Sequence, residues 1–146
     1  MKIDLFTHFV PPQFTAFLQG NELGRTAASR WRNIAALIDL DAHFRVMDQF
    51  DDYVQIPSLA NPAIEAYGSP QETREIAQRA NDAMAGLCER HPDRFPSFVA
   101  SLPMNDPDAA AREAARAVQD LGAAGVLVYT NVLGAPLSEP RFRPVD

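Results

Sequence analysis

The sequence lacks the features that mark disulfide-rich, nucleic-acid-binding and membrane proteins. It has 1 cysteine, Cys88, which excludes an internal disulfide framework and favours a reducing, cytoplasmic location. The 13 Lys and Arg residues against 19 Asp and Glu give a formal net charge of -6, without a basic block that neutralises a row of phosphates. No apolar run approaches the roughly 18 residues of a membrane-spanning helix, and the N-terminus does not resemble a signal peptide. We therefore expect no nucleic acid and no membrane as partners.

The strongest local pattern predicts a long helix in the middle of the chain. The 146 residues are 47% hydrophobic and 22% charged, which is typical of one folded domain. Ser69, Pro70 and Glu72 form a capping box with proline at the first helical position. Apolar residues then recur at helical spacing until His91, where Pro92 ends the helix.

Two further helices are predicted by the same kinds of signal. Asp106 is the cap of a helix over residues 107–121, which Gly122 ends. Asp41 is the predicted cap of a shorter helix over residues 42–50, which buries Phe44, Met47 and Phe50. The long stretch over residues 11–39 carries only weak signals and is assigned one irregular helix.

Short apolar segments rich in β-forming residues lie between these helices. They cover residues 2–6, 53–58, 95–102 and 125–129. Strands that alternate with helices predict a parallel sheet with right-handed crossovers. The expected fold class is therefore α/β.

Four parallel strands with their helices are half of a TIM-type (β/α) barrel, which needs about 250 residues. We expect residues 1–146 to form a single partial domain that corresponds to the N-terminal half of such a barrel. A small open α/β sandwich is one alternative. Two copies that pair their open edges in a homo-oligomer are another.

His8 is the candidate for chemistry because it follows the first predicted strand. Asp4, Phe6 and His8 alternate, so a regular strand points all three to one face. The C-terminal ends of barrel strands carry the active sites of this architecture, and a metal ligand belongs there. The alternative is a lone histidine that makes a hydrogen bond to the backbone.

Four blocks of the sequence resemble one enzyme family along essentially the whole chain. They are the opening MKIDLFTHFVPP, then LDAHFRVMDQFDDYVQ with the following IPSLANP, then NDAMAGLCERHPDRFPSFVASLP, and GAAGVLVYTNVLGAPLSEPRF. In this order they are similar to the amidohydrolase superfamily, and within it to the amidohydrolase-2 branch that includes aminocarboxymuconate semialdehyde decarboxylase. The resemblance covers the N-terminal half of a typical member.

The resemblance implies a divalent metal, usually zinc, held by two first-strand histidines one residue apart and by a later histidine and aspartate. His8 occupies the second position of the pair, and Phe6 replaces the first. A phenyl ring offers no lone pair, whereas a catalytic zinc normally has about three protein ligands. The later ligands have no counterpart in this sequence. His43 and His91 fall on predicted helices, His43 on the outer ring, and are assigned structural roles.

The resemblance also suggests residues that contact the substrate. Arg45 lies in a block where relatives have arginines near the substrate carboxylate, and His43 stands where some have a further arginine. Asn131 follows the fourth strand and is a second candidate, with Asn61 and Thr130 in similar loops. Solvated or turn-forming roles are the alternatives for these residues. Asp4 is expected to support the strand or the metal site, and Cys88 to pack inertly.

The resemblance therefore implies a metal-dependent carboxy-lyase (decarboxylase) or hydrolase that acts on a small carboxylated or aromatic substrate. The alternative is a non-catalytic binding or assembly module in which Phe6 has closed the metal site.

Overall fold

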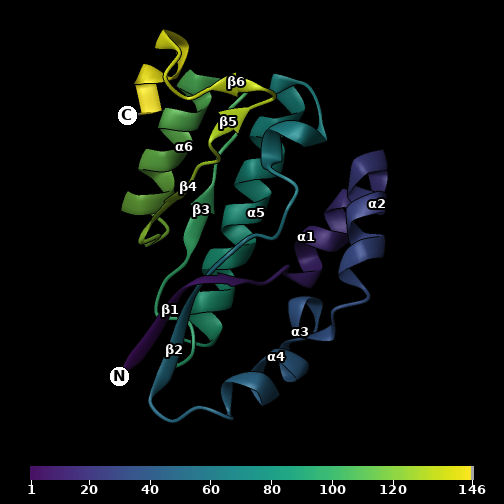
Figure 1. Ribbon diagram of the computed structural model, residues 1–146, viewed down its shortest axis with the longest axis vertical. Coiled ribbons are helices and arrows are strands. Elements are labelled where there is room, and N and C mark those ends of the chain that lie inside the picture. Colours follow the sequence, from purple (N-terminus) through teal and green to yellow (C-terminus); the bar gives the residue numbers. More distant parts are fainter. Residues whose placement is uncertain (146) are drawn as a thin grey trace.

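Strands and helices alternate along the chain, and the first four strands form two parallel pairs. The computed structural model describes residues 1–145. Strand β1 (Lys2–His8) pairs with β2 (Tyr53–Ser58), and β3 (Val99–Ser101) pairs with β4 (Gly125–Leu127) (Figure 1). The predicted α/β class with parallel strands is confirmed, and the strands do not close into a barrel.

The helices and the remaining short elements follow in chain order. They are α1 (Pro12–Phe17), the 3-10 turn η1 (Leu18–Gly20), α2 (Glu22–Trp31), α3 (Ala35–Ile38), α4 (Leu40–Met47), η2 (Ile64–Tyr67), α5 (Pro70–Arg90), α6 (Pro107–Gln119), the antiparallel pair β5 (Asn131–Val132) and β6 (Ala135–Pro136), and η3 (Pro140–Val145).

The helices with strong local signals begin where the sequence predicts. In α5 the Ser69 side chain accepts from the Glu72 N–H, while a Glu72 carboxylate oxygen accepts from the Ser69 N–H at 2.8 Å. In α6 the Asp106 side chain accepts from the Ala109 N–H at 3.2 Å. Gly122 has a φ of 73°, a conformation that glycine adopts without strain, and the chain turns there toward β4.

The predicted start of α4 is wrong by two residues. Asp39, not Asp41, is the cap, because its side chain accepts from the backbone N–H groups of Asp41 at 2.9 Å and Ala42 at 3.2 Å. The helix also ends earlier than predicted, at Met47. Phe50, which was expected to be buried, lies beyond the helix with 51% of its surface exposed. Both aspartates suit a cap, so the local sequence does not distinguish them.

The two parallel strand pairs do not form one continuous ladder. The Gln55 N–H of β2 donates to the Arg94 carbonyl at 3.0 Å, but Arg94 lies in the turn before β3 and not in that strand. The segment over residues 95–98, predicted as strand, is instead irregular, and β3 is correspondingly short. Phe95 and Phe98 are fully buried there, so the apolar pattern reports burial rather than strand.

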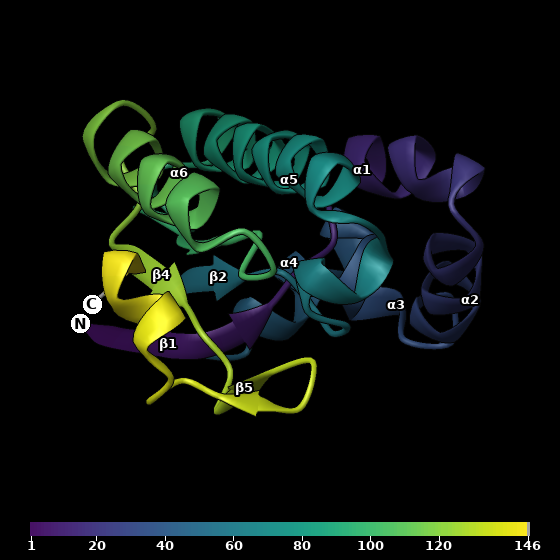
Figure 2. The same ribbon diagram turned by 90° about the horizontal axis from the view of Figure 1, so that it is seen from above.

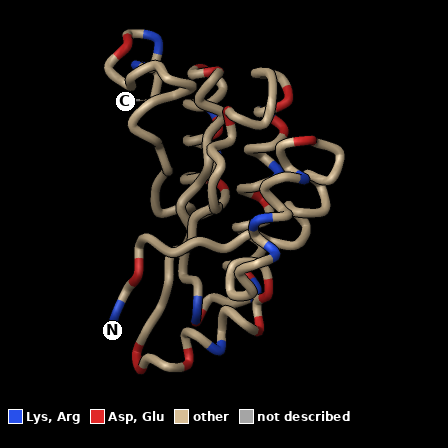
Figure 3. Tube along the Cα trace, turned by 45° about the vertical axis from the view of Figure 1, so that its right-hand side comes forward, with Lys and Arg blue, Asp and Glu red and all other residues tan. Residues whose placement is uncertain are grey.

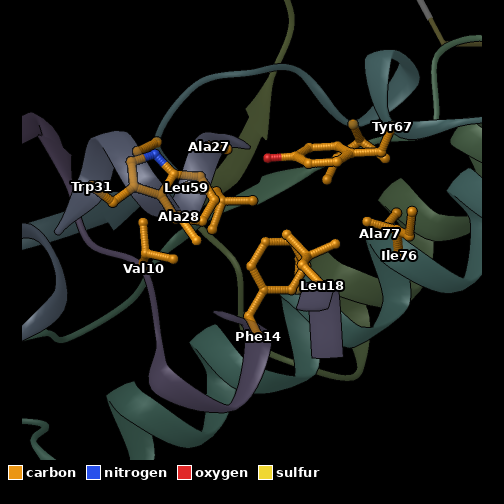
Figure 4. Close-up of a cluster of buried hydrophobic side chains, with 13 residues drawn as sticks. Val10, Phe14, Leu18, Ala27, Ala28, Trp31, Leu59, Tyr67, Ile76 and Ala77 are labelled. Atoms are coloured by element: carbon orange, nitrogen blue, oxygen red, sulfur yellow. The ribbon is translucent and has the colours of Figure 1, made fainter. Parts of the chain in front are cut away.

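Helix α5 packs against two hydrophobic clusters. Its first half contributes Ile76 and Ala77 to a cluster with Phe14, Trp31 and Tyr67, which Figure 4 shows between α1, α2 and α5. Its second half contributes Met84 and Leu87 to a cluster with Phe9, Phe95 and Phe98. In the view of Figure 2, α5 and α6 lie side by side as one layer, with β2 and β4 below them.

The stretch over residues 11–39, predicted as one irregular helix, forms α1, α2 and α3. Trp31 at the end of α2 is 4% exposed and donates from Nε1 to the Asn61 carbonyl at 3.1 Å. This contact holds α2 beside the loop that follows β2.

Charged residues of both signs are interspersed along the helices (Figure 3). Within residues 1–145, no helix combines the length and the apolar composition that crossing a membrane requires.

Candidate functional site

His8 lies at the C-terminal end of β1, opposite Ser58 in the parallel register. Nδ1 of His8 is 2.8 Å from the Ser58 hydroxyl oxygen, and that hydroxyl donates to the Thr7 carbonyl at 3.2 Å. Ser58 is 2% exposed and His8 is half-buried. The predicted position of His8 at a strand end is therefore observed, and its polar partner is a side chain of the neighbouring strand.

Phe6 lies directly beside His8. The two ring centroids are 5.1 Å apart, and the ring planes meet at 70° in an edge-to-face arrangement. Phe6 is 76% exposed, so little of its surface is buried against the rest of the chain. At the position where the family resemblance implies a second ligand, the structure has an apolar ring.

Asp4 and His8 have different polar partners on β2, although both line the same groove beside β1. The β1–β2 register shifts between Asp4 and Thr7. One Asp4 carboxylate oxygen accepts from the Tyr53 hydroxyl at 2.8 Å, whereas His8 contacts Ser58. The irregularity in β1 therefore accompanies a change of partner along β2, from Tyr53 for Asp4 to Ser58 for His8.

A groove runs along β1 toward α3 and α4, with a volume of about 330 Å³. Its lining combines the apolar side chains of Phe6, Ile34, Leu37 and Val46 with the polar side chains of Asp4, Thr7, His43 and Gln55. His8 is among its polar lining residues, and within the described chain the structure gives its Nε2 no hydrogen-bond partner. The groove has the size and chemistry of a site for a small ligand with an apolar ring.

A buried polar network lines the far side of the same groove. His43 is 5% exposed, with Nδ1 2.6 Å from the Ala36 carbonyl oxygen and Nε2 2.5 Å from the Gln55 side-chain oxygen. The Gln55 amide donates to the Tyr53 hydroxyl at 2.9 Å, and Tyr53 donates to Asp4. Burial, and then Asp4, raise the pKa of the Tyr53 hydroxyl, which keeps this donor protonated. These contacts join α4 to β2 and β1.

The prediction that His43 lies on the outer ring is wrong, because its ring is buried between α4 and β2, whereas His91 lies at the end of α5. His43 lies between the rings of Phe9 and Phe95, at centroid distances of 5.3 Å and 5.6 Å. His91 is the C-terminal cap of α5, and its ring lies 5.1 Å from that of Phe44. Among the described residues, neither His43 nor His91 forms a hydrogen bond with His8 or Ser58.

The substrate-binding candidates lie apart from the groove lining. Arg45 is exposed in the last turn of α4, one residue before Val46, which does line the groove. Asn131 is exposed at the start of β5, and its side-chain oxygen accepts from the Gly134 N–H at 2.9 Å. Thr130 is also exposed. The Asn61 side-chain oxygen accepts from the Tyr129 hydroxyl at 2.6 Å, which joins the ends of β2 and β4.

Glu65 was not singled out by the sequence, yet it is a buried carboxyl near the C-terminal ends of β2, β3 and β4. Glu65 is 5% exposed and lines a small hollow with Ser101 and Tyr129. Burial raises the pKa of the Glu65 carboxyl and that of the Tyr129 hydroxyl. The hollow measures about 10 Å³, room for about one water molecule. The local sequence does not indicate that Glu65 is buried, since no motif surrounds it and the residue before it is an ordinary apolar residue, Ile64.

Two further groups are buried without an evident chemical role. The Tyr67 hydroxyl has no hydrogen-bond partner in the described chain, and burial raises its pKa. Burial also raises the pKa of the Cys88 thiol to about 11, which suppresses the reactive thiolate. The expectation of inert packing for Cys88 agrees with this environment.

The residues of the described chain do not fit a divalent metal centre. Among residues 1–145, no group of three or more His, Cys, Asp and Glu side chains is placed to hold an ion. His8 alone faces the groove with a free ring nitrogen, and Phe6 occupies the neighbouring position. A catalytic zinc normally requires about three protein ligands, so this chain supplies an incomplete set.

Comparison with known proteins identifies the family. The model of the amidohydrolase family matches residues 3–145, nearly the whole chain. The chain belongs to the amidohydrolase-2 family. The resemblance seen in the sequence is thereby confirmed.

Amidohydrolase-2 proteins similar to this chain include aromatic-acid decarboxylases. The gamma-resorcylate decarboxylase of Rhodococcus jostii is 39% identical over 129 residues, which cover 87% of this chain and 38% of that protein. A solved structure of 2,6-dihydroxybenzoate decarboxylase with bound 2,6-dihydroxybenzoate has 35% identity and a TM-score of 0.77, and covers 98% of this chain and 44% of that chain.

A third similar protein carries a metal. The dihydroxybenzoic acid decarboxylase of a Polaromonas species was solved with manganese and the inhibitor 2-nitroresorcinol, with 32% identity and a TM-score of 0.77. The match covers 98% of this chain and 44% of that one. This amidohydrolase-2 chain therefore spans less than half the length of these relatives.

Proposed function

We propose that this chain is part of a carboxy-lyase that acts on small aromatic carboxylates. The observation that carries the proposal is the groove of about 330 Å³ beside β1, in which apolar side chains lie next to the free Nε2 of His8. An aromatic ring needs an apolar wall, and its polar substituents need a hydrogen-bonding group at one end. The 39% identity to a gamma-resorcylate decarboxylase supports decarboxylation over hydrolysis, which is the other reaction of the proposal.

Decarboxylation breaks the bond between the ring and the carboxylate carbon. Carbon dioxide leaves, and the ring carbon takes up a proton. In this proposal the apolar lining, with Phe6 and Val46, holds the ring, and His8 orients it through Nε2. Arg45 and Asn131 do not line the groove, and they are proposed to contact a part of the substrate that extends beyond it, Arg45 at the carboxylate. Zinc or another divalent cation is proposed only for an assembly that adds ligands to His8, because the described residues do not complete a set.

The test is conversion of 2,6-dihydroxybenzoate to resorcinol, followed by chromatography, with the 146-residue chain and with any longer polypeptide that contains it. His8→Ala is expected to abolish turnover. His91→Ala is the matched control, since His91 caps α5 away from the groove, and is expected to retain it. Arg45→Ala and Asn131→Ala are expected to raise KM more than they lower kcat. Turnover that survives His8→Ala would exclude this site.

A second candidate function is a non-catalytic binding or assembly module. The edge-to-face contact of Phe6 with His8 favours it, because an apolar ring occupies a ligand position. Elemental analysis of the purified protein for zinc and manganese distinguishes the two candidates. Stoichiometric metal that His8→Ala removes would support the enzyme. A folded protein that has neither metal nor turnover would support the module.

A further inference from the structure

The hydroxyl group of Ser58 contacts two neighbours on β1 and is sealed from solvent. Its oxygen lies 2.8 Å from Nδ1 of His8 and 3.2 Å from the Thr7 carbonyl oxygen. The Ser58 residue is 2% exposed, so water does not compete for this hydroxyl. Ser58 and His8 are also direct partners in the β1–β2 register, which fixes their separation through the backbone.

These two contacts together constrain the position of the ring proton. A serine hydroxyl has one hydrogen to donate, and a carbonyl oxygen can only accept. If the Ser58 hydrogen points to Thr7, the 2.8 Å contact becomes a hydrogen bond only when His8 Nδ1 carries the proton. If the hydrogen points to His8, the contact with the Thr7 oxygen contains no hydrogen. The first arrangement makes one more hydrogen bond.

We propose that Ser58 is a positioning residue that holds neutral His8 with its proton on Nδ1 and the Nε2 lone pair directed to the groove. The other side of the ring supports this orientation. Phe6 packs edge-to-face on His8 and provides no polar partner, and no residue of the described chain contacts Nε2 by a hydrogen bond. The imidazole is therefore fixed at one nitrogen and available at the other.

An available Nε2 lone pair accepts a hydrogen bond from a hydroxyl group. Since the groove also presents apolar side chains such as Phe6 and Val46, the complementary ligand is a ring that bears a hydroxyl. This part of the inference rests on the proposed function, and it deepens that function by naming the substrate group that His8 meets. A suitable probe is a hydroxylated aromatic carboxylate of the kind that a similar decarboxylase binds, and the new element is that its hydroxyl donates to Nε2.

The tautomer is measured directly by long-range ¹H–¹⁵N correlation of the histidine rings in labelled, chelator-treated protein. The measurement is made at about pH 8.5, well above the ordinary histidine pKa of about 6.5, where neutral rings dominate. We expect His8 as the Nδ1–H form. His8 as the Nε2–H form in the parent protein would overturn the inference without any variant.

Two substitutions separate positioning from a merely structural role. Ser58→Ala removes the acceptor and is expected to turn His8 largely to the Nε2–H form or to a mixture. Ser58→Thr keeps the hydroxyl and is expected to restore the Nδ1–H form. Thermal unfolding of each variant shows whether it is folded, and His91 in the same spectra is the internal reference. An unchanged His8 tautomer in folded Ser58→Ala would overturn the inference.

The ligand assignment is tested with 2,6-dihydroxybenzoate as the probe. We expect the probe to bind saturably and to shift the Nε2 resonance of His8. We expect Ser58→Ala to weaken this binding at least about 10-fold, which corresponds to about 1.4 kcal/mol, and Ser58→Thr to leave it unchanged. Turnover of the probe with an unperturbed Nε2 would overturn the role of His8 in the proposed site, while the decarboxylase activity itself would stand. Absence of both binding and turnover would overturn the proposed function and the ligand class, whereas the tautomer is decided independently.

Discussion

Nε2 of His43 lies 2.5 Å from the side-chain oxygen of Gln55, and this contact joins α4 to β2 in the interior of the protein. Both residues are 5% exposed. The second ring nitrogen of His43 contacts the Ala36 carbonyl, so each polar atom of the ring has a partner. Buried polar groups that are paired in this way specify one relative position of helix and strand.

Replacing Gln55 with leucine is expected to destabilise the protein by about 1–3 kcal/mol, because His43 Nε2 is then buried without a partner. The free energy of unfolding in urea measures the effect. Gln49→Leu is the matched control, since Gln49 is exposed just after α4 and, among the described residues, its amide donates to the Arg45 carbonyl alone. It is expected to change stability by less than about 0.5 kcal/mol. Equal effects of the two substitutions would contradict the importance of the buried contact.

Asn81 is expected to be a second sensitive position because it joins three elements. Its side chain donates to the Ser101 carbonyl at 3.0 Å and to Glu113 at 2.7 Å, and accepts from the Ser101 N–H at 2.9 Å. Asn81→Ala leaves these buried groups with fewer partners, which costs about 2–4 kcal/mol on the scale for buried unsatisfied groups. Chemical denaturation of this variant beside Gln78→Ala, an exposed position on the same helix, measures the difference.

Glu65 is expected to make stability depend on pH. Burial raises its folded-state pKa above the ordinary value of 4.5, so the folded protein binds this proton more tightly than the unfolded chain does. The resulting stabilisation is complete below pH 4.5 and is lost as the pH rises through the higher folded-state value.

Glu65→Gln removes this ionisation, and we expect the variant to gain stability relative to the parent between pH 4.5 and neutral pH. Melting temperatures across that range test this, with Glu89→Gln, an exposed glutamate near the end of α5, as the control. A constant difference between Glu65→Gln and the parent over the range would refute the assignment of this pH dependence to Glu65.

The free edge of β1 is expected to mediate self-association of the 146-residue chain. Within residues 1–145 β1 pairs only with β2, and Ile3, Leu5 and Phe6 are 51%, 64% and 76% exposed. Exposed apolar strands with an unpaired edge associate readily. Light scattering of the parent is expected to show dimers or larger species, and Leu5→Lys to reduce them. Val118→Lys, on the exposed side of α6, is the control, and a strictly monomeric parent would contradict the prediction.

The sequence alone predicts the elements whose signals are local. The capping box at Ser69 and the proline after His91 define α5 through contacts within a single turn, and Asp106 does the same for the start of α6. Strand β2 matches its predicted range because its β-forming residues are bounded by turn residues on both sides. The family resemblance also follows from the sequence, since it depends on residue identity and order.

The tertiary structure decides what depends on residues distant in the chain. The shift in the β1 register places Asp4 against Tyr53 and His8 against Ser58, which strict alternation did not predict. The same holds for Glu65, because a carboxyl in a short turn is buried only when other strands and helices cover it. Partner strands and packed helices determine these positions, and their contacts lie tens of residues away. Local signals therefore defined α5 and the start of α6, whereas the environment of the candidate site came from long-range packing.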